Sequence, residues 1–194
     1  MKILFGTNNP NKLREIRAIL SGHYEVLSLK DIQLDMDVDE TEPTLEGNAI
    51  LKATSFYKAA KIPCFSDDTG LEVASINGAP GVKSARYAGE HCSSKDNIVK
   101  LLGALEDKTD RSACFRTIVA FCDGKNTYTF EGRIDGHITK DERGSNGFGY
   151  DPVFQPDGLQ ETFAQLDPDF KNSISHRGKA IQAFAQFLLT YKRV

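Results

Sequence analysis

Two adjacent acids are the part of this sequence best suited to do chemistry. Asp67 and Asp68 lie in segment 66–73 between two short apolar runs, a pattern that predicts a strand, a turn and a second strand. Side chains alternate between the faces of a strand, so we expect the two carboxylates to point apart. One could then be structural, while the other faces an open cleft and holds a divalent cation or takes a proton from water. An Asp-rich turn that only caps the backbone is the alternative.

Segment 7–12 has the composition of a phosphate site. A strand is expected at residues 2–6 and a helix directly afterwards, with Asn9 as its N-cap and Pro10 as its first residue. The N-terminus of a helix offers backbone N–H groups and a positive dipole end to an anion, and Lys12 adds an ammonium group. A plain capped helix remains possible. The segment is not a Walker P-loop, because the glycines and the G-K-S/T ending are missing.

The acidic segment 35–46 could bring a second carboxylate to the same cation. Its acids follow part of the spacing of an EF-hand loop, but Glu40 replaces the turn-forming glycine and Pro43 interrupts the loop. We therefore reject the EF-hand. Glu40 is our choice for reaching the cation of Asp68, with Asp39 and Glu42 as competitors and a solvated loop as the alternative.

A helix is expected from Thr44, its cap, to about residue 60. Asn48 and Lys52 are spaced i and i+4, so they share one face of that helix. This face could supply an amide and a cation beside a phosphate and metal site. The pattern alone favours the simpler interpretation, a solvent-exposed face.

Two later segments have residues suited to different parts of a ligand, a planar base for one and a carbonyl oxygen or a phosphate for the other. The glycine-rich segment 143–152 displays Phe148 and Tyr150, and an aromatic ring on a loop can stack on a base, although both rings could instead plug the core. His176 and Arg177 follow Ser175, the expected N-cap of the last helix, where cations oppose the helix dipole. Both donate hydrogen bonds, so they suit a carbonyl oxygen or a phosphate; a surface cap is the alternative.

Composition excludes several classes of protein. The chain has 194 residues and a formal net charge of −3, which argues against a general nucleic-acid binder. It contains no apolar run of about 18 residues, so we expect no membrane span and no membrane partner. The N-terminal apolar run is too short for a signal peptide, and we expect a cytoplasmic protein. The four cysteines form no C-x-x-C pair and are expected to be reduced packing thiols.

The order of expected elements predicts an α/β fold. The opening strand, helix and strand over 2–29 favour a parallel pair with a right-handed crossover. Asn77 and Gly78 form a strong hairpin signal. Residues 112–122 and 127–134 alternate as two long antiparallel strands. The sheet is therefore expected to be mixed.

Five motifs in this order together resemble one family, the inosine triphosphate pyrophosphatases, over nearly the whole chain. The motifs are Thr7-x-Asn9-x-x-Lys12, Glu40 with Asn48 and Lys52, Ser66-Asp67-Asp68-Thr69-Gly70-Leu71, Gly147-Phe148-Gly149-Tyr150-Asp151-Pro152, and Ser175-His176-Arg177-Gly178. The resemblance implies one domain, 1–194, with two intimate lobes around a long mixed sheet flanked by helices, and an active cleft between the lobes. It also implies a homodimer and a Mg²⁺-dependent reaction. That reaction cleaves XTP, ITP and dITP to the monophosphate and pyrophosphate and so cleanses the nucleotide pool.

The resemblance also assigns roles to residues of this sequence. Asp68 would be the general base, and Glu40 and Asp68 would bind Mg²⁺. The remaining expected substrate-binding residues are Thr7, Asn8, Asn9, Pro10, Asn11, Lys12, Asn48, Lys52, Thr69, Phe148, Gly149, Tyr150, Asp151, Lys171, His176 and Arg177. Two other functions stay open: a related nucleotide pyrophosphatase with a different base preference, and a catalytically silent nucleotide-binding protein.

Overall fold

The computed structural model describes residues 2–20 and 24–191. The chain divides into two compact units. The first unit consists of Met1–Asp68, Thr117–Gly132 and Arg177–Val194, and the second unit of Thr69–Arg116 and Arg133–His176. Strands β3, β5 and β6 each contribute residues to both units.

The strands of the described residues form one mixed sheet, as expected. Its order is β2-β1-β3-β5-β6-β7, with β4 paired to β3. Strand β1 is parallel to β2 and to β3, whereas β4 is antiparallel to β3 and β7 is antiparallel to β6. The bounds are β1 Lys2–Phe5, β2 Glu25–Leu27, β3 Cys64–Val73, β4 Pro80–Gly81, β5 Ser112–Cys122, β6 Thr127–Ile138 and β7 Phe154–Pro156.

Five α-helices accompany these strands in the described part of the chain. They are α1 Pro10–Ile19, α2 Leu45–Ala60, α3 Ser94–Ala104, α4 Pro168–Ile174 and α5 His176–Thr190. Two expected N-caps are confirmed, because the Asn9 side chain accepts hydrogen bonds from Asn11 N and Lys12 N, and that of Thr44 accepts one from Gly47 N. The short helix α4 is not predicted by the sequence analysis.

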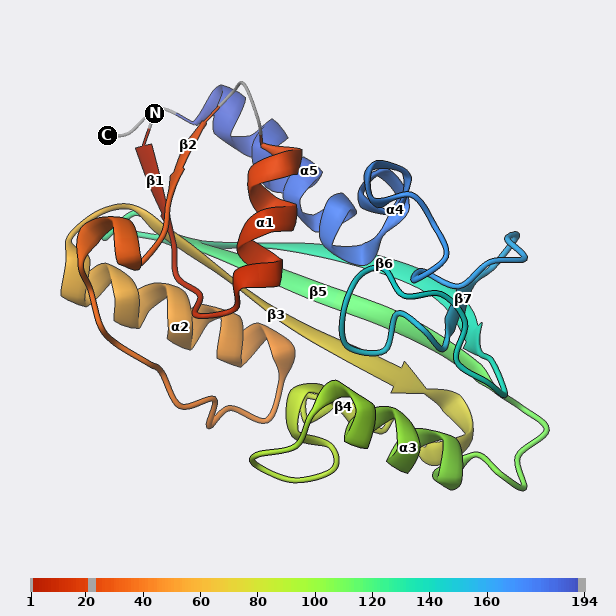
Figure 1. The fold of residues 1–194 in the computed structure, drawn as a ribbon. Coiled ribbons are helices and arrows are strands. Elements are labelled where there is room, and N and C mark those ends of the chain that lie inside the picture. The colour runs from red at the N-terminus through yellow and green to blue at the C-terminus, as the bar shows by residue number, and fades with distance from the viewer. Residues whose placement is uncertain (1, 21–23, 192–194) are drawn as a thin grey trace. The chain divides into compact units, whose positions relative to one another are not determined.

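The two faces of β3 meet different partners within the first unit. Phe65 packs with residues of α1 and α5, including Ile16 and Phe184. Its neighbour Cys64 packs instead with Phe56 of α2, and Figure 1 shows α2 apart from α1 and α5. Because side chains alternate along a strand, Asp67 lies on the same face of β3 as Phe65, and Asp68 lies on the same face as Cys64. The two acids therefore face different helices.

The second unit has its own apolar core. Leu71 of β3, Leu101 of α3 and Phe115 of β5 are buried in it, together with Phe154 of β7 and Tyr150 of the glycine-rich loop. The hairpin expected at Asn77 and Gly78 is confirmed by the antiparallel pairing of β3 with β4.

The prediction of a turn within 66–73 is wrong, because β3 runs without interruption through Asp67, Asp68 and Thr69. Strand β3 lies between β1 and β5 in the sheet, and Gly6 N donates to Phe65 O at 2.8 Å. A turn at this point would leave interior backbone groups without partners, which costs more than the local turn preference of Asp and Gly provides.

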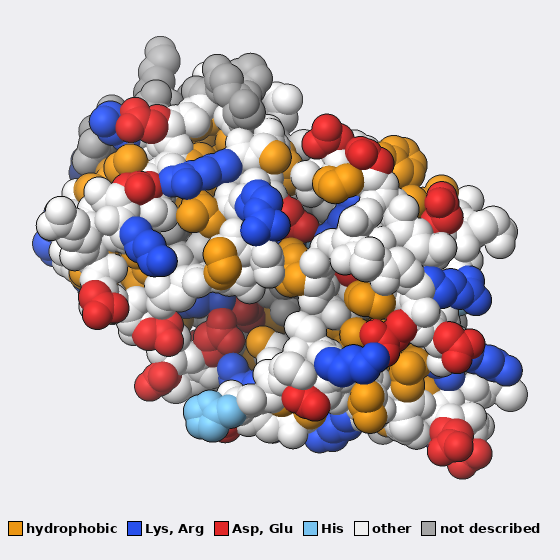
Figure 2. All heavy atoms as spheres, viewed as in Figure 1, with side chains coloured by type: hydrophobic (Ala, Val, Ile, Leu, Met, Phe, Trp, Pro, Cys, Tyr) orange, Lys and Arg blue, Asp and Glu red, His pale blue; other side chains and the backbone are white. Residues whose placement is uncertain are grey.

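The surface and the helices agree with the composition. In the view of Figure 2, Lys and Arg side chains alternate with Asp and Glu side chains, with no broad area of one sign. Among residues 2–20 and 24–191, no helix is long and apolar enough to cross a membrane.

Candidate active site

Asp68 is buried on the α2 side of β3, in a cluster with Lys52, Asn48 and the half-buried Glu40. Lys52 Nζ lies 2.9 Å from Asp68 Oδ1 and 2.5 Å from Glu40 Oε1. Asn48 Nδ2 lies 3.5 Å from Asp68 Oδ2. Both Asn48 and Lys52 are buried, so the solvent-exposed face that the helical pattern favoured is wrong. The helical spacing shows only that this face of α2 is polar. Its polar side chains can be buried because they pair with carboxylates that belong to other segments, which the spacing does not show.

The two carboxylates of this cluster have pKa values that move in opposite directions. Burial, with the nearby Glu40 carboxylate adding to it, raises the pKa of Asp68 to about 6 against the pull of Lys52. Burial also opposes the charge of Glu40, but Lys52 outweighs it and lowers the pKa of Glu40. Two neighbouring acids that share one cation are expected to lose their protons in two separate steps. Asp68 is the member that holds its proton longer.

Glu40 and Asp68 form a donor set that fits Mg²⁺. Their oxygens already converge on one cationic atom, Lys52 Nζ. Within the described residues, no three His, Cys, Asp or Glu side chains gather as a metal site. Mg²⁺ does not need them, because it keeps several waters and takes one or two protein carboxylates. Of the competing acids, Asp39 and Glu42 are exposed, and only Glu40 contacts Lys52.

Asp67 belongs to a second network, on the opposite face of β3. Its Oδ2 lies 3.1 Å from Lys12 Nζ and 3.2 Å from Arg177 Nε. Arg177 Nη1 in turn donates to Glu15 Oε2 at 2.5 Å. Burial alone would raise the pKa of Asp67, but Lys12 and then Arg177 outweigh it and hold that pKa well below its usual range. Asp67 is therefore ionised throughout the physiological range.

The N-terminus of α1 differs from the expected anion site in one respect. Asn11 N and Lys12 N both donate to Asn9 Oδ1, and Pro10 has no N–H. Asn8 Nδ2 donates to Asp37 Oδ1 at 3.2 Å, and Thr7 Oγ1 accepts from Asn9 N. The cap thus uses the N–H groups that an anion would need. The Lys12 ammonium is the group of this segment that remains suited to a phosphate.

In the second unit, Asp151 ties the glycine-rich loop to α4. Its Oδ2 accepts hydrogen bonds from Phe148 N at 2.8 Å and from Lys171 Nζ at 2.7 Å. Gly147 has a φ of +75°, and a Cβ there would lie 2.0 Å from the same oxygen, so only glycine fits. Lys171 Nζ also lies 5.2 Å from the centre of the Phe148 ring, which places a cation against an aromatic face.

Three other expected substrate-binding residues lie in the second unit. Tyr150 is buried in the core, and its hydroxyl donates to Ser84 O at 2.9 Å. The buried imidazole of His176 stacks on Phe115, with ring centres 4.5 Å apart. Thr69 is half-buried on β3. The core-filling alternative therefore describes Tyr150 well, while Phe148 is half-buried in the loop.

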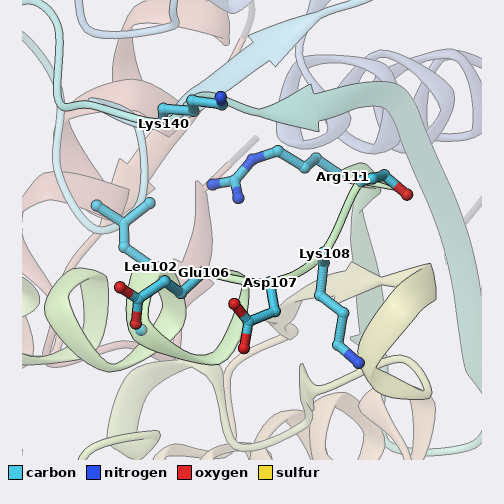
Figure 3. Close-up of a pocket in the computed structure, with 8 residues that line it drawn as sticks. Leu102, Glu106, Asp107, Lys108, Arg111 and Lys140 are labelled. Atoms are coloured by element: carbon cyan, nitrogen blue, oxygen red, sulfur yellow. The ribbon is translucent and has the colours of Figure 1, made fainter.

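A hollow of about 820 Å³ in the second unit lies apart from all these groups in the sequence (Figure 3). It is lined by Leu102, Gly103, Glu106, Asp107, Lys108, Thr109, Arg111 and Lys140, none of them an expected site residue. The Arg111 guanidinium donates to three backbone carbonyls, those of Leu105, Ile138 and Thr139. Its charge is therefore used to hold the backbone, and the remaining lining groups carry both signs.

Comparison with known proteins decides the family. The model of the Ham1 family matches residues 3–187. The chain belongs to the Ham1 family. A dITP/XTP pyrophosphatase of Porphyromonas gingivalis is 50% identical, covering 98% of this chain and 99% of the relative. One of Flavobacterium johnsoniae is 49% identical, covering 99% of this chain and all of the relative.

Solved structures of the Ham1 family share the fold. The Staphylococcus aureus Ham1 protein matches with a TM-score of 0.89 and 41% identity, covering 99% of this chain and 100% of that one. A HAM1 protein from Coxiella burnetii matches with a TM-score of 0.90 and 37% identity, covering 98% and 100%. The resemblance read from the five motifs and the mixed α/β fold class are thereby confirmed.

The sequence pattern assigns no specific role to two members of these networks. It indicates Asp67 only as one of a pair in which one acid could be structural, and it gives no role to Glu15. A signal for Glu15 exists, because it lies three residues after Lys12 on α1 and so shares its face. No comparable signal connects either residue to Arg177, which is 110 residues away from Asp67 along the chain.

Proposed function

We propose that this chain hydrolyses deaminated purine nucleoside triphosphates, XTP, ITP and dITP, to the monophosphate and pyrophosphate, with Mg²⁺ as cofactor. The proposal is supported by the relatives named dITP/XTP pyrophosphatase. The observation that carries it is the cluster formed by the buried Asp68 and Lys52 with the half-buried Glu40. It combines a carboxylate of raised pKa, a cation and a second carboxylate. A protein that only bound a nucleotide would have no need of such a base.

Asp68 is the proposed general base. Hydrolysis between the α- and β-phosphates requires a water to attack phosphorus while a positioned group takes its proton. Because the pKa of Asp68 lies at about 6, its carboxylate is mostly ionised at neutral pH and still accepts a proton more readily than an ordinary aspartate. Asn48 and Lys52 hold the two oxygens of this carboxylate and so fix its direction.

Glu40 and Asp68 are the residues proposed to hold Mg²⁺. The bound ion supplies neutralisation of the triphosphate charge. Lys12 and Lys52 are proposed to bind phosphate oxygens as well, because each ammonium has three donors. Lys52 is buried and the side chain of Lys12 is 15% exposed. The remaining predicted residues of segment 7–12 would contact the substrate through their side chains, since the cap occupies the N–H groups of Asn11 and Lys12.

Base recognition is proposed for the second set: Thr69, Phe148, Gly149, Tyr150, Asp151, Lys171 and His176. Arg177 was predicted with them, but its side chain is 3% exposed and paired with Glu15 and Asp67, so we propose that it supports the site from the first unit without touching the base. Phe148 offers a ring for stacking, and Lys171 and His176 offer hydrogen-bond donors. Donors facing the 6-position accept a 6-oxo purine and leave a poor pairing with the 6-amino group of adenine. In a buried site such a mismatch costs several kcal/mol, as an order of magnitude. We also propose a cytoplasmic homodimer acting on the nucleotide pool, testable by light scattering and cell fractionation.

The test is pyrophosphate release from ITP, dITP, XTP, GTP, ATP and dTTP, with Mg²⁺ and with a chelator. We expect Mg²⁺-dependent release of pyrophosphate that favours the inosine and xanthosine nucleotides by at least about 100-fold, the scale of discrimination that pocket contacts provide. Orthophosphate as the product, or equal rates with ATP and GTP, would contradict the proposal. Binding without any turnover would favour the silent nucleotide-binding alternative.

A further inference from the structure

Asp67 is placed to act through other residues and not on a substrate. Its side chain is 1% exposed, so a nucleotide, a metal ion or an attacking water would have no direct route to it. Its Oδ2 instead contacts two cations, Lys12 Nζ at 3.1 Å and Arg177 Nε at 3.2 Å. Two cations hold this carboxylate, so we infer that Asp67 acts on a reaction through them.

The contacts form a chain of alternating charges that ends at Lys12. Glu15 binds Arg177 Nη1, Arg177 Nε binds Asp67, and Asp67 binds Lys12. Arg177 is thus held at two points of its planar guanidinium group, which fixes the plane. The side chain of Arg177 is 3% exposed and that of Lys12 is 15% exposed. We therefore expect the fixed position of Arg177, at the buried end, to restrict the position of the Lys12 ammonium group at the more accessible end.

Lys12 needs such a support more than most groups that bind phosphates. A lysine side chain is flexible and ends in a compact point charge, so by itself it defines no direction. The cap of α1 fixes its backbone through Lys12 N, and Asp67 Oδ2 fixes the far end. Together they hold the ammonium group before any ligand arrives.

We propose that Asp67 is a positioning residue: braced by Arg177, it holds the Lys12 ammonium group in the place from which it binds the phosphate chain of the substrate. This inference rests on the proposed function and deepens it. It assigns to the first acid of the pair a role different from that of Asp68. A displacement of about 1 Å at a group that orients a substrate can cost about 100-fold in rate, so we expect an effect of that size.

A double-mutant cycle between Asp67 and Lys12 tests the inference, with Asp67→Asn, Lys12→Gln and the double variant. The readouts are kcat and KM for ITP and the Kd of inorganic tripolyphosphate, a phosphate chain without a base, measured by calorimetry. In the wild-type background we expect Asp67→Asn to lower kcat/KM about 100-fold and to raise the tripolyphosphate Kd at least about tenfold. In the Lys12→Gln background we expect the same change to alter either quantity less than about threefold, because the residue through which Asp67 acts is absent.

Asp31→Asn is the matched control. Asp31 also accepts from an arginine of the first unit, Arg17 Nη2, at 2.6 Å, but it belongs to neither network around β3. The Asp31→Asn substitution should change neither kcat/KM for ITP nor the Kd of tripolyphosphate. Equal losses from Asp67→Asn in both backgrounds, or an unchanged tripolyphosphate Kd in the single variant, would overturn the inference.

Two further outcomes remain informative. If Asp67→Asn does not fold, Lys12→Gln is compared with the double variant, which removes one charge of each sign; a further loss above threefold would contradict the inference. If the wild-type protein releases no pyrophosphate, the proposed function fails by itself. The tripolyphosphate measurements still decide the role of Asp67 in that case.

Discussion

Asp67 and Asp68 are neighbours of the same chemical type, yet the protein gives them opposite environments. Asp67 lies on the α1 and α5 side of β3 between two cations, and its pKa is lowered against the effect of burial. Asp68 lies on the α2 side, shares the ammonium of Lys52 with Glu40, and has a pKa raised to about 6. One acid is a permanent charge that organises cations. The other is a carboxylate whose proton can be moved.

The number of cations that contact a buried carboxylate determines whether it stays ionised or can take up a proton. A buried acid that contacts two cations stays ionised, and a permanent negative charge is suited to holding cationic side chains in place. One cation between two acids leaves the pair short of positive charge, so burial prevails and one acid keeps its proton longer. The same shortage of positive charge favours an added divalent cation. Four measurements test this contrast between the two acids.

Asp68→Asn should nearly abolish turnover while binding persists. Loss of a general base costs about 10² to 10⁴ in rate, and we expect kcat for ITP to fall by about 10³ or more. The Kd of ITP, measured by calorimetry at saturating Mg²⁺, should change by less than about tenfold, because Lys12 and Lys52 still bind phosphates. Asp135→Asn, which removes an exposed carboxylate paired with Arg133, is the control. If kcat of Asp68→Asn stayed within threefold of the wild-type value, the assignment of Asp68 as general base would be wrong.

Asp67→Asn should be the more destabilising of the two substitutions. Breaking a buried ion pair costs about 3 to 5 kcal/mol, because cations are left without their partner, and we expect a loss of about 3 kcal/mol at pH 7. The folded pKa of Asp67 is depressed, so its contribution is present above the unfolded pKa, about 3.9. It is lost as pH falls through the lower folded value.

Urea unfolding at pH 7, 5 and 3 measures this dependence. The difference between wild type and Asp67→Asn should be constant from pH 7 to 5 and should shrink at pH 3. A difference that grows on acidification would show that the charge of Asp67 does not stabilise the fold.

Glu40→Gln should raise the Mg²⁺ requirement. Glu40 and Asp68 are the proposed ligands, and removal of one carboxylate should raise the half-saturating Mg²⁺ concentration by about tenfold or more, the scale found when groups that support a metal site are lost. A chelator should abolish pyrophosphate release by the wild type, and added Mg²⁺ should restore it. Asp39→Asn and Glu42→Gln change exposed acids of the same segment and serve as controls. If Asp39→Asn raised the Mg²⁺ requirement as much as Glu40→Gln does, the assignment of Glu40 as a Mg²⁺ ligand would be contradicted.

Asp68→Asn should slightly stabilise the metal-free protein at pH 8. A folded pKa raised to about 6 means that the ionised form is disfavoured in the folded state, at about 1.4 kcal/mol for each pKa unit. That raised pKa already includes the attraction of Lys52, and we expect a net gain of about 1 kcal/mol from the substitution. The wild type gains stability as pH falls from above 6 towards 4, since Asp68 is then protonated in the folded state.

Unfolding at pH 8 and pH 4 without metal checks this sign. The advantage of Asp68→Asn should be present at pH 8 and absent at pH 4. A variant less stable than wild type at pH 8 would mean that Lys52 outweighs burial at this site.

The amino-acid sequence alone is enough to predict the local elements and the family. Short-range chemistry predicts the caps at Asn9 and Thr44, the hairpin at Asn77 and Gly78 and the parallel opening pair, and the structure contains each of them. Alternation along a strand was also enough to predict that the two acids point apart. The ordered motifs identified the family because each fixes a residue type at a position where few others suit.

Tertiary structure alone decided which groups each acid meets. It kept β3 straight where Asp and Gly favoured a turn, because an interior strand must bond on both sides. It buried Asn48 and Lys52, which the helical pattern placed in solvent, because Asp68 and Glu40 reach them from outside α2. It joined Lys12, Asp67 and Arg177 from three distant segments. A pKa depends on such neighbours in space, so the division of labour between two identical residues could not be read from their order in the chain.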